Sequence, residues 1–83
     1  MFESLNDPVD VLTAFVEGRM EPLRFRWKGR VVRVARVTGR WTRREGQARI
    51  QCFAVENSAA DSYELSYDPR GSRWLLSRAW RKP

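Results

Sequence analysis

Residues 22–38 alternate between apolar and basic side chains in a pattern that predicts two β-strands joined by a tight turn. In the first strand the apolar positions are Leu23, Phe25 and Trp27. The positions between and after them carry the cations Arg24, Arg26 and Lys28. Because successive side chains of a β-strand point to opposite faces, this strand should bury one face and expose a cationic one. Lys28 and Gly29 then predict a two-residue hairpin turn.

The predicted turn determines which side chains of the two strands lie opposite each other. On the inner face it pairs apolar side chains, Phe25 with Val32 and Leu23 with Val34. On the outer face it sets Arg24 directly opposite Arg33. Two cations in this position repel each other unless acidic side chains or a bound anion lie beside them. This pair is therefore the main functional clue in the sequence.

Residues 7–18 carry the signals of a short α-helix. Asp7 suits the N-cap, Pro8 suits the first helical position, and Gly18 is a natural stop. Apolar side chains recur at helical spacing, at Val11, Leu12, Phe15 and Val16. We expect this apolar face to pack against a sheet. The alternative is a helix that binds a membrane surface or a partner, but its other face is acidic, whereas that of a membrane binder is basic.

The middle of the chain predicts a loop and a further strand. Beyond Arg33 the valines change face, which predicts a bulge or a strong coil near residues 35–36. Residues 39–46 are dense in cations and are expected to form a loop with Trp41 in its middle. Residues 47–56 predict a third strand that is apolar on both faces and therefore central in the sheet.

The C-terminal part predicts a second hairpin. Residues 57–62 are small and polar and predict a surface loop, and residues 63–67 alternate like a half-buried strand. Residues 68–71, Asp-Pro-Arg-Gly, have the sequence of a β-turn. This turn predicts that two apolar pairs share one buried face, Leu65 with Trp74 and Tyr63 with Leu76.

These elements predict one α+β domain over residues 1–83. It has a short N-terminal helix at residues 7–18 and about five antiparallel strands in a meander over residues 22–80. A sheet this small and this rich in aromatic residues can coil into a partly closed β-barrel. Three tryptophans fall at apolar positions and are expected in the core: Trp27, Trp74 and Trp80.

The net charge of +6 hides an alternation along the chain. Residues 1–21 carry a net charge of −4, and residues 22–49 carry ten cations and one anion. Residues 50–69 carry −4 again, and residues 70–83 carry +5. The basic block attracts phosphates, but the acidic segments beside it could equally neutralise it within the protein.

The sequence gives little support for an enzyme. It has no histidine to transfer protons near neutral pH, and Cys52 stands alone in an apolar strand. A single cysteine forms no intrachain disulfide and suits a reducing cytoplasmic setting. We expect no cofactor, no metal and no membrane insertion, and the acidic N-terminus is unlike a signal peptide.

Nucleic-acid binding is better supported. Six arginines could project from one sheet face and one loop, with a tryptophan available to stack on a base. These candidate nucleic-acid-binding residues are Arg24, Arg26, Arg33, Trp41, Arg43, Arg44 and Arg49. We expect a nucleic-acid partner, with single strands favoured.

Two other interpretations of the basic surface stay open. The arginines could form a solvated face whose stems cover the apolar side chains beneath. Alternatively, Trp41 among arginines could be a hot spot for an acidic protein partner. Self-association is also possible if the acidic first helix meets the basic hairpin of a second copy.

The order of several short motifs resembles a small uncharacterised bacterial domain. The motifs are W-x-G-R at residues 27–30, a loop tryptophan at Trp41, Y-E-L at residues 63–65 and D-x-x-G-x-x-W-x-L at residues 68–76. That domain occurs alone and as a C-terminal piece of proteins related to Y-family translesion DNA polymerases. The resemblance covers residues 22–80, except that residues 50–53 depart from it. It implies association with DNA damage tolerance and brings no catalytic residue.

Overall fold

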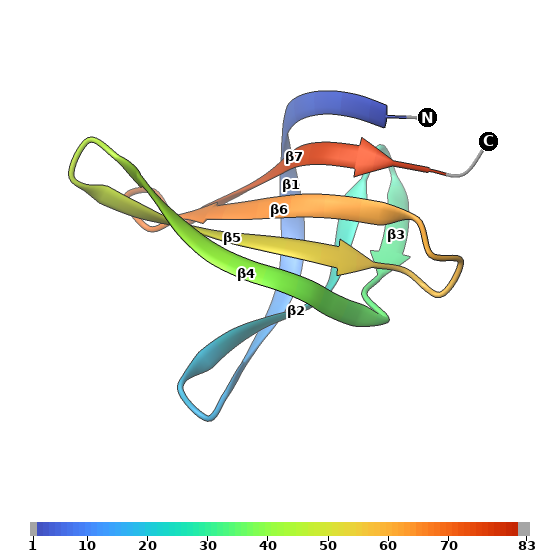
Figure 1. Ribbon diagram of the computed structural model, residues 1–83, viewed down its shortest axis with the longest axis horizontal. Helices are drawn as coiled ribbons and strands as arrows, with labels where there is room; N and C mark the ends of the chain where they lie inside the picture. Colours follow the sequence, from blue (N-terminus) through green and yellow to red (C-terminus); the bar gives the residue numbers. More distant parts are fainter. Residues whose placement is uncertain (1, 82–83) are drawn as a thin grey trace.

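The computed structural model describes residues 2–81, which form a single antiparallel sheet of seven strands (Figure 1). In space the strand order is β3-β2-β1-β7-β6-β5-β4. The strands are β1 (Phe2–Val16), β2 (Arg19–Trp27), β3 (Arg30–Arg33), β4 (Arg36–Glu45), β5 (Ala48–Glu56), β6 (Ser62–Asp68) and β7 (Arg73–Trp80). The described part of the chain contains no helix, so the predicted α+β class is wrong and the fold is all-β.

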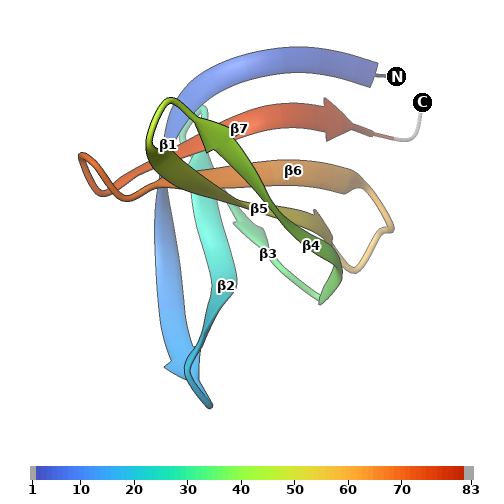
Figure 2. The same ribbon diagram turned by 60° about the vertical axis from the view of Figure 1, so that its left-hand side comes forward.

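The long strand β1 joins two parts of the sheet. Its first half, up to Val9, pairs with β7, and its second half, from Asp10 to Val16, pairs with β2. The strand bends between these halves, which turns the β2–β3 hairpin over one face of β5, β6 and β7 (Figure 2). The sheet stays open, so the meander of about five strands in a partly closed barrel is replaced by a folded seven-stranded sheet.

The helix predicted at residues 7–18 is wrong because this segment buries its side chains with a period of two. From Leu5 to Thr13 the odd-numbered side chains are partly or fully buried and the even-numbered ones are exposed. The Asp7 carboxylate does not cap a helix, because its Oδ2 accepts a hydrogen bond from the Trp27 indole Nε1 at 3.0 Å. Gly18 ends no helix either, since it forms the β1–β2 turn together with Glu17. Pairing with a strand on each side overrides the local helix signals.

The register predicted for the β2–β3 hairpin is confirmed. Arg24 lies opposite Arg33, and Phe25 lies opposite Val32. Lys28 and Gly29 have φ values of 53° and 73°, as a type I′ turn requires of both central residues. The inward position predicted for Leu23 is wrong. The β1–β2 register shifts there, so Leu23 is 46% exposed while the neighbouring Pro22 is buried.

The loop predicted at residues 39–46 is also wrong, because most of it belongs to β4. This strand runs along one edge of the sheet, and its cations suit an exposed edge because charged side chains discourage pairing with other chains. The bulge predicted near residues 35–36 is a full break between β3 and β4, which lie at opposite edges. The connecting segment is bonded to strands from both halves of the sheet, since the Val34 N–H donates to the Leu23 carbonyl in β2 and the Ala35 N–H to the Glu56 carbonyl in β5.

Strand β5 lies between β4 and β6 and buries side chains on both faces, as predicted. Phe53 and Val55 face the main core, whereas Ile50 and Cys52 belong to a small cluster on the outer face.

In the β6–β7 hairpin the predicted face is buried, but the register differs. Leu65 pairs with Leu76 rather than with Trp74, because the turn occupies residues 69–72 instead of residues 68–71. The remaining register corrections are Tyr67 with Trp74 and Tyr63 with Ala79.

The main core lies between the β2–β3 hairpin and the β5–β7 part of the sheet. The Tyr63 ring meets Phe25 edge-on at 5.3 Å and Trp27 at 6.3 Å between ring centroids. Trp27 and Trp74 are buried as predicted, whereas Trp80 is 37% exposed and lies outside the buried core. Aromatic packing therefore holds the folded-over hairpin in place.

We predict that Asp7→Ala lowers the free energy of unfolding by about 1–3 kcal/mol, because it leaves the buried Trp27 N–H without its acceptor. Asp10→Ala removes an exposed carboxylate from the same strand and should change stability by less than about 0.5 kcal/mol. Urea unfolding followed by tryptophan fluorescence measures both. Equal effects of the two substitutions would show that the Asp7–Trp27 bond does not stabilise the fold.

Candidate nucleic-acid interface

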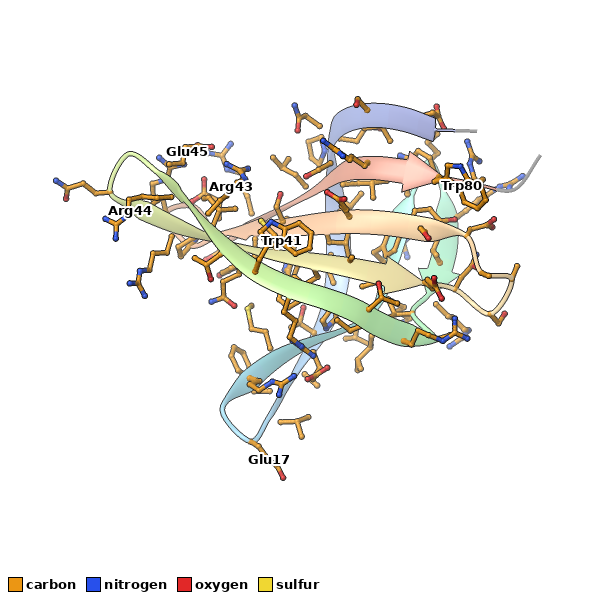
Figure 3. All side chains as sticks on the ribbon, viewed as in Figure 1. Glu17, Trp41, Arg43, Arg44, Glu45 and Trp80 are labelled. Atoms are coloured by element: carbon orange, nitrogen blue, oxygen red, sulfur yellow. The ribbon has the colours of Figure 1, made fainter. Side chains whose placement is uncertain are left out.

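The predicted site residues lie on three surfaces rather than on one sheet face and one loop. Arg24, Arg26 and Arg33 project from the outer face of β2 and β3, which we call the hairpin face. Trp41 and Arg43 lie on the outer face of β4, over the cluster around Cys52 (Figure 3). Arg44 and Arg49 lie opposite each other on the other face of the β4–β5 hairpin, near its turn.

The hairpin face is built from two rows of side chains across β1, β2 and β3. One row runs from Leu12 through Arg24 to Arg33. The other row runs from Asp10 through Arg26 to Val31. These side chains line a shallow groove of about 520 Å³. The groove therefore combines three cations with two exposed aliphatic side chains and one carboxylate.

The arginines of the hairpin face lack the acidic partners that would offset their repulsion. Among residues 2–81, none of these three guanidinium groups forms an ion pair or a side-chain hydrogen bond. Asp10 lies across from Arg26 in the ladder, but the two do not form an ion pair. The cross-strand pair of Arg24 and Arg33 therefore carries an uncompensated electrostatic cost in the free protein.

Other cations of the basic block are neutralised within the protein. Arg40 donates to both carboxylate oxygens of Glu21 at 2.6 Å, and Arg36 pairs with Glu56. Arg43 donates to Glu45 at 2.9 Å. The acidic segments thus neutralise part of the basic block and leave the hairpin face charged. Neutralisation within the protein, one of the two outcomes that the sequence left open, therefore applies to part of the block only.

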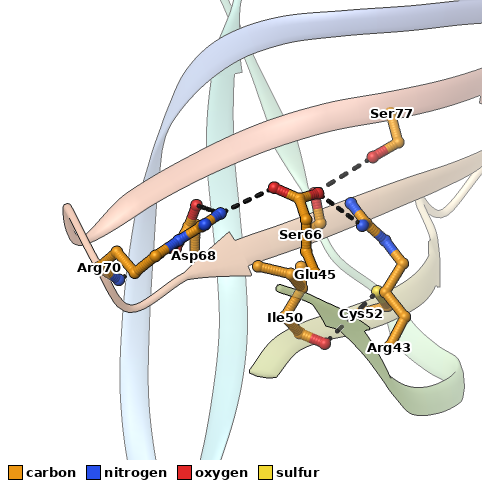
Figure 4. Close-up of polar contacts among 8 residues, drawn as sticks. All are labelled: Arg43, Glu45, Ile50, Cys52, Ser66, Asp68, Arg70 and Ser77. Atoms are coloured by element: carbon orange, nitrogen blue, oxygen red, sulfur yellow. Dashed lines mark hydrogen bonds and ion pairs between the residues drawn. The ribbon is translucent and has the colours of Figure 1, made fainter. Parts of the chain in front are cut away.

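Arg43 belongs to a chain of ion pairs that lies over the outer cluster of β5 (Figure 4). Glu45 bridges Arg43 and Arg70, and Arg70 also donates to Asp68 at 2.7 Å. The hydrogen bond to Glu45 raises the pKa of Arg43, and the two arginines lower the pKa of Glu45. Hydrogen bonds from Arg70 lower the pKa of Asp68 to about 2. Arg43 is thus less available to an external anion than the hairpin-face arginines.

Trp41 lies opposite Cys52 in the ladder and is 43% exposed. It therefore covers part of the small outer cluster and still presents ring surface to solvent. Cys52 itself is buried, and burial raises the pKa of its thiol. Burial and a raised pKa both make this thiol a poor nucleophile near neutral pH.

Arg44 and Arg49 form a second pair of arginines directly opposite each other. Both are exposed, and within the described chain neither forms an ion pair. Sequence reasoning named both residues but missed their pairing, because it placed Arg44 in a loop. It also missed Leu12 and Val31, which flank the hairpin-face arginines and are 50% and 54% exposed. Leu12 was missed because it was assigned to a helix, although the regular alternation of Val9, Val11 and Thr13 is a strand signal.

Comparison with protein-family models, with curated proteins and with solved structures finds no match to this chain. The described residues contain no helix long and apolar enough to cross a membrane. They also contain no group of three or more cysteine, aspartate or glutamate side chains that could hold a metal ion.

We predict that Arg70→Gln raises the pKa of Asp68 from about 2 toward its ordinary value, because Arg70 supplies the hydrogen bonds that favour the carboxylate. Since the folded pKa is depressed, any stability that this contact gives is present above the unfolded pKa and is lost as the pH falls toward 2. Carboxyl-detected NMR titration measures the change. Arg73→Gln is the matched comparison: Arg73 lowers the same pKa only through its charge and with a smaller effect, so this variant should raise the pKa less. An unchanged Asp68 titration in the Arg70 variant would contradict the assignment.

Proposed function

We propose that this protein is a small non-enzymatic domain that binds single-stranded or damaged nucleic acid through its hairpin face. The observation that carries the proposal is the cross-strand pair of Arg24 and Arg33, which has no acidic partner in the described structure. A phosphate between two guanidinium groups replaces their repulsion with charge-assisted hydrogen bonds. Arginine suits this role because its planar group can bind a phosphate through two parallel N–H donors.

The apolar side chains of the hairpin face favour a single strand over a duplex. Leu12 and Val31 are half exposed and lie in the same rows as the arginines. A single strand can turn its bases and sugars toward such side chains, whereas a duplex keeps its bases stacked inside. Arginines for the backbone beside apolar side chains for the bases are therefore best suited to an unpaired strand.

The resemblance described above supports a role as an accessory in bacterial DNA damage tolerance. Such a role places the protein in the cytoplasm, where its single buried thiol suits a reducing environment. Single strands and distorted bases are the substrates that damage tolerance presents. The process is part of the proposal and rests on the resemblance, whereas the binding face rests on the arginine geometry.

The second candidate function is a protein-interaction module of a repair or polymerase assembly. The observation that favours it is also on the hairpin face, where Leu12 and Val31 are exposed beside arginine. Arginine surrounded by apolar surface is typical of protein-binding hot spots, and an acidic partner would suit the charge. Self-association through an acidic first helix does not apply, because the residues of that predicted helix belong to β1.

We predict that Arg24→Gln/Arg33→Gln weakens binding of a labelled single-stranded oligonucleotide. If the three hairpin-face arginines contact phosphates, the plot of log K against log[salt] has a slope of about −2, and this variant should reduce it to about −0.7. Fluorescence anisotropy at several salt concentrations, with single-stranded and duplex oligonucleotides, measures both values. Arg73→Gln, an exposed arginine without an ion pair in the described structure, is the control and should change the slope little.

The fold of the Arg24→Gln/Arg33→Gln variant should be as stable as the parent or more stable by up to about 1 kcal/mol, since the substitution removes repulsion. Weaker binding with undiminished stability would separate a binding role from a structural one. If the folded parent protein binds no oligonucleotide at low salt, the nucleic-acid proposal is wrong. In that case the hairpin face should be tested against acidic proteins.

A further inference from the structure

A second groove lies between the two longest hairpins of the sheet. The β1–β2 and β4–β5 hairpins project in different directions from the body of the sheet (Figures 1 and 2). The groove between them has a volume of about 420 Å³. Its apolar lining includes Phe15 and Met20 from the first hairpin, Phe53 from the second and Tyr67 from β6. Thr42 and Gln51 provide polar groups on the β4–β5 side.

The most conspicuous side chain of this groove is Phe15. It is 74% exposed, the highest value among the exposed large apolar side chains of the described chain. It pairs with Met20 across the β1–β2 hairpin, and both side chains line the groove. A phenyl ring left in water contributes nothing to folding through burial and costs free energy by exposing apolar surface. The ring is therefore placed where a ligand could stack on it.

The groove continues toward the second opposed pair of arginines. Thr42 pairs with Gln51, and the next pair on the same face of the β4–β5 hairpin is Arg44 with Arg49. These two arginines are exposed, and in residues 2–81 they have no ion pair. Arg44 and Arg49 do not line the groove but lie one pair beyond its Thr42–Gln51 side. Strand alternation places this arginine pair on the same face of the β4–β5 hairpin as Thr42 and Gln51.

Arg40 holds the two walls of the groove together. Its Nη1 donates to the Met20 carbonyl at 2.9 Å, and its Nη2 donates to Glu21 at 2.6 Å. These bonds connect β4 to β2, two strands that are not neighbours in the sheet. Because Glu21 neutralises Arg40, this arginine supports the groove, and the free charge for an anion comes from Arg44 and Arg49.

We infer that this groove is a second contact site for the same single strand, which takes a base against Phe15 and a phosphate further along the strand at Arg44 and Arg49. This inference rests on the proposed nucleic-acid function and extends it from the hairpin face to a second surface. Bases and phosphates alternate along an unpaired strand, so the aromatic surface of the groove and the arginine pair beyond it can contact the same strand. An acidic peptide would use the arginines but would leave the Phe15 ring without a stacking partner.

The test compares two groove variants with two controls by fluorescence anisotropy of a labelled single-stranded oligonucleotide at low salt. Phe15→Ala should weaken binding roughly 5- to 150-fold, the range found when an aromatic stacking partner is removed. Val16→Ala is the matched control, because Val16 is 52% exposed at the same turn and does not line the groove. Since Phe15 is largely exposed, its removal should leave the urea midpoint unchanged.

The arginine pair beyond the Thr42–Gln51 side of the groove is tested by Arg44→Gln/Arg49→Gln. This variant should weaken binding and reduce the salt slope by about 1.4, the value for two phosphate contacts on a single strand. The charge-matched comparison is Arg24→Gln/Arg33→Gln on the hairpin face. Weaker binding in both groove variants, with Val16→Ala unchanged, supports the groove as a binding site.

Different experimental outcomes would overturn the two proposals. Oligonucleotide binding that depends on Arg24 and Arg33 but is unchanged in both groove variants overturns the groove site and keeps the hairpin face. No oligonucleotide binding by the folded parent overturns both. Binding of a glutamate decamer in place of the oligonucleotide, lost in Arg44→Gln/Arg49→Gln, would identify the groove as a site for acidic peptides and overturn the inference.

Discussion

The hydrogen bond between Asp7 and Trp27 connects the two parts of this fold. Asp7 lies in the half of β1 that pairs with β7, whereas Trp27 lies at the end of β2 next to the turn. The bond therefore ties the folded-over hairpin to the larger part of the sheet. Trp27 is 6% exposed and packs against Tyr63, and the Asp7 carboxylate accepts its N–H. This bond and the aromatic packing around Tyr63 together hold the hairpin face in position.

The bend of β1 also determines where charge remains on the surface. Folding brings the acidic N-terminal segment to β4, where Glu21 neutralises Arg40. At the start of β4, Arg36 pairs with Glu56 at the end of β5. The carboxylates of Glu21, Glu56 and Glu45 thus form ion pairs with arginines of β4. The opposed arginines of the hairpin face lie beyond their reach. The net charge of the basic block is a poor guide to binding, because its arginines differ in whether a carboxylate already satisfies them.

Short-range features of the sequence predicted structure well where one turn determined the outcome. Lys28 and Gly29 determined the β2–β3 register. The apolar side chains on both faces of residues 47–56 indicated an interior strand. Asp7 and Pro8 have the local sequence of a helix start, so the prediction of a helix was wrong for a reason that lies outside this segment. Their strand state depends on pairing with β7, whose partners lie far along the chain. The register of β6 and β7 was wrong because the four-residue turn lies one residue later than predicted, at residues 69–72.

The placement of some candidate site residues was wrong for a related reason. Arg44 was assigned to a loop, since cations and glycine around Trp41 are typical of loops as well as of edge strands. Only the pairing of β4 with β5 shows that Arg44 lies opposite Arg49. Likewise, assigning Phe15 to a helix gave it a buried role, whereas at the end of a projecting hairpin it is exposed. The sequence identifies the basic and aromatic residues, but the sheet face on which each one lies depends on long-range strand pairing.

The two opposed arginine pairs have the same energetic consequence although they lie on different surfaces. Each pair costs roughly 0.2–1 kcal/mol in the free protein, which a domain with a total stability of about 5–15 kcal/mol tolerates. An anion that binds between the two guanidinium groups removes this cost and adds its own attraction. Part of the affinity for an anion is therefore stored in the folded protein as repulsion. A neutral residue at one position of a pair would release that repulsion permanently and leave less to gain from binding.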